Sequence, residues 1–373
     1  MRTGKASLAF SIAGVAVATL LLSFILALYR GWNDGLVTYI EDTDADVWVT
    51  PYGSESFFSP GIFPRSTLDS VRGQAGVLDA TALVYRPTKL RTSKGAWDTW
   101  VVGFAESGVG GPAHLKRGTG RPGIGEIVLD EVLANLADVS VGSTVDIDGS
   151  QLKVVGISGG GNVVFAQLAF VNAEEARLQS EAATKRQDVP EEVASVVRNG
   201  INLGLVRARP GEEAAVTRAI RANVLGVRTF QSDDFSESSR RALKQSMLPI
   251  LIIILALAFL VGTLVLGLTV YTSVIEKERE FGVIKAIGAT GPALLRVVLE
   301  QALVCCVAGF ALGIVFSWIA ARIVIAAVPQ FIVSFRATDT LMVFAGTVLM
   351  SILASVIPAA RIMKVDTLSV FKA

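Results

Sequence analysis

The chain has 373 residues, of which 51% are hydrophobic and 18% are charged, and its mean hydropathy is +0.54. This composition is typical of a membrane protein and excludes an ordinary soluble domain of this length. The net charge of +1 gives no basic footprint for nucleic acid, and the single histidine, His114, excludes a multi-histidine metal site.

The first apolar segment, Ala6–Tyr29, follows the basic residues Arg2 and Lys5. The apolar core of a cleaved secretory signal has only about 7–15 residues and ends at a small-residue cleavage site. This segment is long enough to cross a bilayer, and it leads directly into Tyr29-Arg30-Gly31-Trp32, which suits a membrane interface. We therefore expect an uncleaved first span.

Three further apolar runs predict three more spans, and the basic residues of the short segments between them set the orientation. These basic residues are Arg2, Lys5, Lys277, Arg279, Lys285, Arg296, Arg361, Lys364 and Lys372. All of them fall on one side, whereas the short connection before the last span carries only Arg336. Because cytoplasmic loops are enriched in Lys and Arg, we expect both termini in the cytoplasm of a multi-pass protein of the cell (inner) membrane.

The predicted spans divide the chain into consecutive segments. In chain order these are a cytoplasmic N-terminus with the first span (1–30), an extracytoplasmic domain with stalk helices at both ends (31–245), the second span (246–273), a cytoplasmic coupling helix (274–292), the third span (293–328), a short external loop (329–340), the fourth span (341–358) and a cytoplasmic tail (359–373). The expected fold is an α-helical membrane protein with four transmembrane helices and a large extracytoplasmic α+β domain between the first two.

Alternating apolar and polar residues predict several short strands within the extracytoplasmic domain. The expected strands are 46–50, 81–90, 99–104, 126–130, 144–147 and 152–157, and a strand, helix and strand follow at 202–208, 212–225 and 227–230. A short helix is expected at 66–74, and polar helices at 31–46 and 232–245 would form the paired stalks. The polar stretch 174–199 is expected to be a surface helix or a flexible excursion, and a β-rich subdomain is expected near 115–200.

The glycine-rich stretch Gly156–Gly161 does not have the pattern of a nucleotide-binding loop. Such a loop needs G-x-x-x-x-G-K-[ST], in which the lysine reaches the terminal phosphates, and that pattern occurs nowhere in the chain. We expect these glycines to form a mobile loop between strands.

Glu300 and Gln301 interrupt the third apolar run near its cytoplasmic end. Ionisable side chains inside a membrane are rare and often functional, which is one interpretation of Glu300. The interpretation we adopt places Glu300 at the headgroup level, where it makes a capping or inter-helix bond.

Small residues in the same run predict close helix packing. Gly309 and Gly313 form a G-x-x-x-G pattern, which lets a neighbouring helix approach closely, either within the chain or in an oligomer. Cys305 and Cys306 are adjacent and lie among apolar residues, so we expect them to be packing residues and not a disulfide or metal pair.

An amphipathic pattern occupies the segment Glu276–Thr290 between the second and third predicted spans. Its apolar residues Phe281, Ile284 and Ile287 recur at helical spacing, with charged residues on the other sides. The turn-forming residues Gly288–Pro292 are expected to end this helix. A helix this short is unstable alone in water, so it needs a membrane interface or a groove on another protein.

This segment, together with Leu294–Leu303, resembles the hallmark of the FtsX-like or MacB-type ABC transporter permeases, relatives of which include MacB, LolC/LolE, DevC and haem-exporter permeases. The family pattern is roughly E-R-x-R-E-[IF]-G-[IV]-x-[KR]-A-[IL]-G-A-[TS], followed by a glutamate, here Glu300. The stretch from Gly125 to Ile157 resembles the family's periplasmic core. Ile357–Arg361 with Val365-Asp366 resembles its C-terminal signature.

The resemblance implies a permease that is not itself an enzyme, binds no cofactor, and works with a separate cytoplasmic ATP-binding subunit that holds ATP and Mg. The residues that match the motif, and that would carry the coupling to ATP hydrolysis, are Glu278, Arg279, Glu280, Phe281, Gly282, Lys285 and Gly288. Helix-packing roles fall to Glu300, Gly309 and Gly313. ATP-driven movement of the coupling helix would be transmitted to the extracytoplasmic domain, a mechanism called mechanotransmission.

The resemblance also implies partners, and it leaves the cargo open. Four spans are few for enclosing a pathway, so a second permease copy is expected, as a homodimer before a heterodimer, in contact with membrane lipids and with an extracytoplasmic accessory protein as a further candidate. The first functional hypothesis is export or extraction (efflux) of a hydrophobic or amphipathic cargo. The alternatives are a non-transporting relay that regulates an extracytoplasmic enzyme such as a cell-wall hydrolase, and a membrane-anchored sensor without an ATPase partner.

Overall fold

The computed structural model describes residues 2–59, 61–160, 162–163, 166–186, 188, 190–287, 289–328 and 331–363. The chain forms two compact units. The first, which we call the helical unit, contains Met1–Gly31, Met247–Ala327 and the segment from Val333 onward, and the second, the sheet unit, contains Trp32–Ser246 and Val328–Ile332. Predicted features outside the described residues are Gly161 of the glycine-rich stretch, Gly288 of the coupling motif, Pro329 and Gln330 of the external loop, and Lys364–Ala373 with Val365-Asp366.

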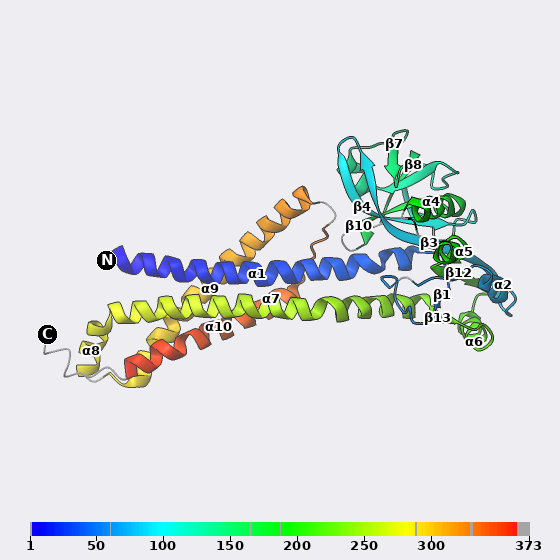
Figure 1. Cartoon of the computed structure of the whole chain (residues 1–373). Helices are drawn as coiled ribbons and strands as arrows, with labels where there is room; N and C mark the ends of the chain where they lie inside the picture. Colours follow the sequence, from blue (N-terminus) through cyan, green and yellow to red (C-terminus); the bar gives the residue numbers. More distant parts are fainter. Residues whose placement is uncertain are drawn as a thin grey trace. The chain divides into compact units, whose positions relative to one another are not determined.

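Long helices dominate the helical unit (Figure 1). They are α1 (Arg2–Asp42), α7 (Ser232–Glu276), α9 (Gly291–Ala327) and α10 (Ala337–Met363), and the short α8 (Glu278–Ala286) follows α7. Among the described residues, these four long helices contain the stretches that are long and apolar enough to cross a membrane. α1 and α7 are unbroken helices that contribute residues to both units.

Two helix starts differ from the expected boundaries, and each has a local cause. α10 begins at Ala337, inside the predicted external loop, and Asp339 lies in its first turn, where a carboxylate interacts favourably with the positive end of the helix. α9 begins at Gly291, so Pro292 starts this helix instead of only ending the previous one. Proline suits a first helical turn because the main-chain N–H that it lacks would have no partner there.

Small side chains make up part of the interior of the helical unit. The buried small residues of its helices include Ala16, Ala18, Ala258, Ala302, Cys305, Cys306, Ala321 and Ala354. The two cysteines are free thiols. Ser351 of α10 donates its hydroxyl to the main-chain oxygen of Ala302 on α9 over 2.9 Å. Because lipid gives helices no hydrophobic reason to associate, close backbone packing and bonds of this kind hold them together.

Among the described residues, one mixed sheet of eleven strands organises the sheet unit. Its strand order is β13-β1-β12-β3-β4-β10-β6-β8-β5, with β7 paired to β3 and β8 and β9 paired to β10, while β2 and β11 pair separately. The strands are β1 (Val47–Pro51), β2 (Phe63–Pro64), β3 (Val77–Thr92), β4 (Gly95–Phe104), β5 (His114–Gly118), β6 (Glu126–Asp130), β7 (Thr144–Ile147), β8 (Ser150–Gly159), β9 (Asn162–Val163), β10 (Ala166–Asn172), β11 (Gly200–Ile201), β12 (Leu203–Ala208) and β13 (Val227–Gln231). The helices are α2 (Thr67–Arg72), α3 (Glu131–Ala137), α4 (Ala173–Arg186), α5 (Glu191–Asn199) and α6 (Glu213–Asn223).

The long strand β3 joins the two halves of this sheet. Its first part pairs with β12 up to Leu83, and its second part pairs with β4 from Val84 onward. β4 in turn pairs in parallel with β10. The β-rich region therefore includes β3 and β4 and is not limited to residues 115–200, as the sequence suggested. The local pattern predicted these strands but could not identify their partners, because strand pairing is non-local.

The glycine-rich stretch is a second correction, since most of it belongs to strand β8 and not to a mobile loop. Gly156 lies opposite Val128 of β6 and Gly118 of β5. A Cβ atom on Gly156 would lie 2.1 Å from the main-chain oxygen of Thr119. Glycine is needed here because another backbone approaches the strand closely.

The polar stretch after β10 forms the two helices α4 and α5, and α4 is partly buried. Glu175 and Gln179 of α4 are buried, and Gln179 donates to Glu175 over 3.0 Å. Glu175 also accepts from the Gly125 main-chain N–H over 2.9 Å, and Gln179 accepts from Arg86 of β3 over 3.2 Å. These bonds satisfy polar groups that would otherwise be costly to bury, so α4 is a fixed part of the sheet unit and not a flexible excursion.

Asp148, in the turn between β7 and β8, ends the same polar network. It pairs with Arg86 and accepts from the Thr88 hydroxyl over 2.8 Å. Burial alone raises the pKa of Asp148, but the bonds from Arg86 and Thr88 and the charges of Arg86 and Arg186 together outweigh burial, so its pKa lies below the ordinary value. The stabilisation from Asp148 is therefore fully present above its ordinary pKa of about 4 and is lost as the pH falls through the lowered value.

We expect Asp148→Asn to flatten the acid dependence of stability. The wild-type protein should lose thermal stability as the pH falls below about 4, and the variant should lose less over the same range. Thermal unfolding followed by tryptophan fluorescence across a pH series measures this difference. Asp98→Asn is the control, because the exposed Asp98 carboxylate lies 3.7 Å from Lys89 and such surface pairs contribute little. Superimposable pH profiles for the Asp148 variant and the wild type would contradict the assignment.

Candidate functional site

The coupling motif forms α8, a separate helix between α7 and α9. The helix covers Glu278–Ala286, with Lys277 before it and Ile287 closing its last turn through a bond from its N–H to the Val283 oxygen. It therefore contains Glu278, Arg279, Glu280, Phe281, Gly282 and Lys285 of the predicted coupling set. Gly288 of that set lies outside the described residues.

Large apolar side chains remain exposed on and beside α8. Val283 and Ile284 are each more than two-fifths exposed, and Ile287 is 81% exposed. Glu280 is also exposed, whereas Gly282 is buried. Burying an aliphatic side chain of this size contributes roughly 1.5–3 kcal/mol relative to leaving it in water. A nine-residue helix with these side chains exposed is suited to lie against another surface.

The G-x-x-x-G pattern of α9 lies against α1 within the chain. A Cβ on Gly309 would lie 2.6 Å from the Cβ of Val15, and one on Gly313 would lie 2.5 Å from the Cβ of Thr19 and 2.7 Å from the Ala16 main-chain oxygen. No side chain fits at these distances without movement of α1. The two glycines therefore set the separation of α1 and α9.

Glu300 makes a different bond from the one expected. Its carboxylate accepts from Arg296, one turn earlier on the same helix, over 2.8 Å, and both side chains are exposed. The expectation of a cap or an inter-helix bond from Glu300 is therefore wrong, because an arginine at i−4 is the nearest partner. The inter-helix bond comes from its neighbour Gln301, which donates to the Ser273 hydroxyl of α7 over 3.0 Å.

An ion pair between α1 and α10 was missed by the sequence analysis. Arg30 donates two parallel hydrogen bonds to Asp339, of 2.8 and 2.9 Å, and the Asp339 side chain is only 10% exposed. Nearby, the Ser334 N–H donates to the Ala27 oxygen over 3.0 Å. A bidentate ion pair of this kind fixes the relative orientation of the two side chains as well as pairing their charges. The available signal was opposite charge on two residues at the same predicted ends of the first and fourth spans.

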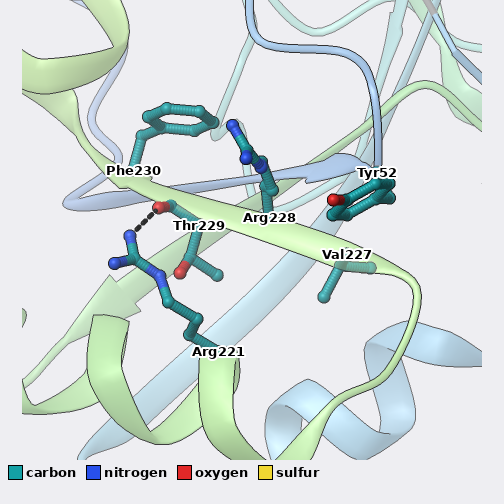
Figure 2. A pocket seen from close by; sticks show the side chains of 6 residues that line it. All are labelled: Tyr52, Arg221, Val227, Arg228, Thr229 and Phe230. Carbon is teal, nitrogen blue, oxygen red and sulfur yellow. Dashed lines mark hydrogen bonds between the residues drawn. The ribbon is translucent and has the colours of Figure 1, made fainter.

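A cavity of about 440 Å³ is present in the sheet unit at strand β13 (Figure 2). It is lined by Tyr52, Arg221, Val227, Arg228, Thr229 and Phe230. Arg221, at the end of α6, donates to the Thr229 main-chain oxygen over 2.8 Å. Arg228 pairs with Glu55, and its guanidinium lies 5.4 Å from the centre of the Tyr52 ring. No sequence motif indicates this site, because its residues come from three separate segments.

Two protein-family models match this chain over most of its length. Residues 252–367 match the FtsX-like permease C-terminal model, which includes α8, α9 and α10. Residues 8–223 match the MacB-like periplasmic core domain model, and this match alone spans more than half of the chain. The chain belongs to the FtsX-like, MacB-type ABC transporter permeases. It is accordingly a membrane permease, and membership of this family implies an ATP-binding partner. The sheet unit of the permease lies largely within the match to the periplasmic core.

Relatives of this permease include two mycobacterial proteins whose names describe them as uncharacterized ABC transporter permeases. One, from Mycobacterium tuberculosis, is 27% identical over 295 residues, covering 78% of this permease and 76% of the relative. Another, from Mycobacterium bovis, is 23% identical over 363 residues, covering 97% and 94%. These alignments extend through both units of the permease.

Solved structures similar to this permease include the external regions of two transporters. The periplasmic region of MacB from Actinobacillus actinomycetemcomitans is 13% identical, with a TM-score of 0.38, covering 53% of this permease and 94% of that chain. The extracellular domain of the ABC-type transporter YknZ from Gram-positive bacteria is 12% identical, with a TM-score of 0.35, covering 50% and 99%.

Proposed function

We propose that this permease couples ATP hydrolysis by a separate cytoplasmic subunit to movement of its extracytoplasmic domain, and thereby exports or extracts a hydrophobic or amphipathic cargo. The observation that carries the proposal is α8, a short helix whose apolar side chains are exposed at the motif that the family uses for coupling. These side chains would be buried in a groove of the ATP-binding subunit. ATP and Mg would be bound by that subunit, and this chain would contribute no catalytic residue.

The continuity of α1 and α7 supports transmission of movement between the two units. Both helices contain apolar spans of the helical unit and polar residues of the sheet unit without a break in the helix. α7 leads directly to α8, with Lys277 as the residue between them. A displacement of α8 would therefore be passed to α7 through the shortest possible connection. This is the mechanotransmission mechanism that the family resemblance implies.

The character of the helical unit favours a cargo of low polarity. A cavity of about 350 Å³ lies between α7 and α10, and it is lined by Thr263, Leu264, Gly267, Leu268, Tyr271, Leu353 and Ala354. No charged residue belongs to this lining. Ion and solute pathways through membranes are lined by charged groups or backbone carbonyls, whereas this cavity offers mainly apolar walls.

The same proposal defines the assembly and its orientation. Two permease copies, most simply identical, would meet two ATP-binding subunits on the cytoplasmic side of the cell (inner) membrane. Both termini and α8 would then be cytoplasmic. Membrane lipids would surround the exposed apolar faces of the helices, and an extracytoplasmic accessory protein would act at the sheet unit.

Reconstitution of ATP hydrolysis tests this function directly. We expect the purified permease to show no hydrolysis alone, and its ATP-binding partner subunit to hydrolyse ATP faster when both are in the same lipid vesicles. An ATP-binding subunit with an inactivated nucleotide site is the control. ATP hydrolysis by the permease alone at the rate of the complete assembly, or an ATP-binding subunit indifferent to the permease, would contradict the proposal.

A further inference from the structure

Strand β13 lies at one end of the eleven-stranded sheet. Among the strands that the structure describes, it has β1 as its one neighbour. At the two ends of this pair, the Ser232 N–H bonds to the Asp46 oxygen, and the Tyr52 N–H bonds to the Gly226 oxygen. Main-chain groups of an antiparallel strand alternate in direction, so Arg228 and Phe230 face β1.

The intervening residues Val227, Thr229 and Gln231 consequently direct their main-chain N–H and C=O groups away from β1. No other strand pairs with this side of β13 in the part of the chain that the structure describes, but Val227 and Thr229 are buried, at 8% and 0% exposed, so the edge is covered in this structure. A sheet edge that becomes uncovered is a template for pairing with another extended chain. The cavity adjoins this strand. It is lined by four consecutive strand residues, 227–230, whose side chains point alternately to the two faces of the sheet, as Figure 2 shows.

Arg221 occupies part of the edge. Its guanidinium donates to the Thr229 main-chain oxygen, an acceptor that an added strand would otherwise use, as Figure 2 shows. Within the described residues, Arg221 forms no ion pair, whereas Arg228 on the other wall is paired with Glu55. The cavity therefore carries one guanidinium whose charge has no carboxylate beside it.

We propose that the edge of β13, uncovered when Arg221 moves off the Thr229 oxygen, is a docking site for an extended acidic segment of a partner protein. The segment adds to the sheet as a strand next to β13. Its main-chain N–H replaces Arg221 as the donor to the Thr229 oxygen, and the released guanidinium binds a carboxylate of the segment. Main-chain pairing supplies the affinity, and Arg221 selects the charge.

Charge also argues against a second copy of the permease at this edge. β13 reads Val-Arg-Thr-Phe-Gln and contains a basic but no acidic residue. Arg228 is paired with Glu55, but pairing of two β13 strands would bring the Arg221 side chains of both copies together, and juxtaposed like charges are unfavourable at an interface. An acidic segment gives the opposite balance. Docking at this edge does not depend on coupling to ATP hydrolysis.

The test uses full-length permease in lipid nanodiscs and fluorescently labelled short peptides. The probe peptide alternates glutamate and valine, and fluorescence polarisation reports its binding. A second peptide has lysine in place of glutamate, and a third keeps the glutamates but carries N-methyl groups on alternate amides, which removes the strand hydrogen bonds. We expect the acidic peptide to bind and the other two to bind at least about tenfold more weakly.

The variant Arg221→Glu should weaken binding of the acidic peptide by about tenfold or more. Arg121→Glu is the matched control, because it makes the same charge change on an exposed arginine outside the cavity and should bind the peptide as the wild type does. Equal binding of the N-methylated peptide, unchanged binding to the Arg221 variant, or no binding of the acidic peptide would overturn the proposal. Disulfide cross-linking of two copies through Gln231→Cys, at a yield that excess acidic peptide does not lower, would assign the edge to a second copy instead.

Discussion

Replacing Ile287 by Asp should reduce permease-stimulated ATP hydrolysis by about tenfold or more. Ile287 is 81% exposed, so a polar side chain there leaves the permease itself folded. In the proposed complex the same position is buried in the ATP-binding subunit. A carboxylate placed in an apolar contact loses the burial of the isoleucine and is itself desolvated, and each 1.4 kcal/mol corresponds to about tenfold in affinity.

Glu280→Lys tests the charged side of α8 in the same assay. Glu280 is exposed, and its reversal would set a like charge against the groove that holds α8. The control for Ile287→Asp is Ile124→Asp, which makes the same substitution at an apolar residue of the sheet unit that is 66% exposed. The assembly that contains this control variant should hydrolyse ATP at the wild-type rate. Wild-type rates in both α8 variants would show that this helix is not the coupling element.

The second large effect is expected from Gly313→Ala, which should lower the thermal unfolding temperature by about 5 °C or more. The added Cβ would lie 2.5 Å from the Thr19 Cβ and 2.7 Å from the Ala16 main-chain oxygen. A methyl group cannot be accommodated at these distances unless α1 and α9 separate along their length. Overpacking of this kind typically destabilises a core by about 1–3 kcal/mol.

Gly346→Ala on α10 is the matched control, because this glycine-to-alanine change should not lower the unfolding temperature. A Cβ at this position meets no atom within 4 Å, so the change adds helix propensity without a clash. We expect the unfolding temperature of this variant to stay the same or rise, since alanine favours a helix over glycine by up to about 1 kcal/mol. Unfolding in detergent measures both variants. If Gly313→Ala unfolds at the wild-type temperature and only weakens association of two copies, the glycines serve an oligomer contact and not the packing of α1.

The parts of this fold that local patterns determine were predictable. Apolar runs of sufficient length predicted the spans because a bilayer demands about twenty apolar residues in a helix. The charged and apolar spacing at 276–290 predicted a short helix, and α8 lies within that range. Alternation predicted strands such as β6, which covers the expected residues 126–130.

The parts that depend on distant residues were not predictable in the same way. The local pattern predicts a loop at Gly156, because nothing near it in sequence indicates that the Thr119 backbone approaches it. The composition around Glu175 predicts a surface helix or a flexible excursion, because the bond from Gly125 comes from 50 residues away. Local propensity gives no information on such partners, and burial of polar groups becomes favourable only once these bonds exist.

The candidate sites differ in the same way, since a site of consecutive residues was predictable and sites of distant residues were not. The coupling motif was predictable because its residues are consecutive and their spacing carries the amphipathic pattern. The Arg30–Asp339 pair joins residues 309 positions apart, and the cavity at β13 draws Tyr52 into contact with residues 221–230. Both require the folded chain, because only strand and helix pairing brings such residues together.

Photo-cross-linking from α8 in intact cells tests the central claim most directly. A photoreactive amino acid replaces the exposed Ile287, the cells are irradiated, and the cross-linked products of the permease are identified by mass spectrometry. We expect a covalent product with the cytoplasmic ATP-binding subunit, and none of it when the same amino acid replaces Ile124 of the sheet unit. Products from position 287 that contain extracytoplasmic proteins and no ATP-binding subunit would contradict the placement of α8 and the coupling that depends on it.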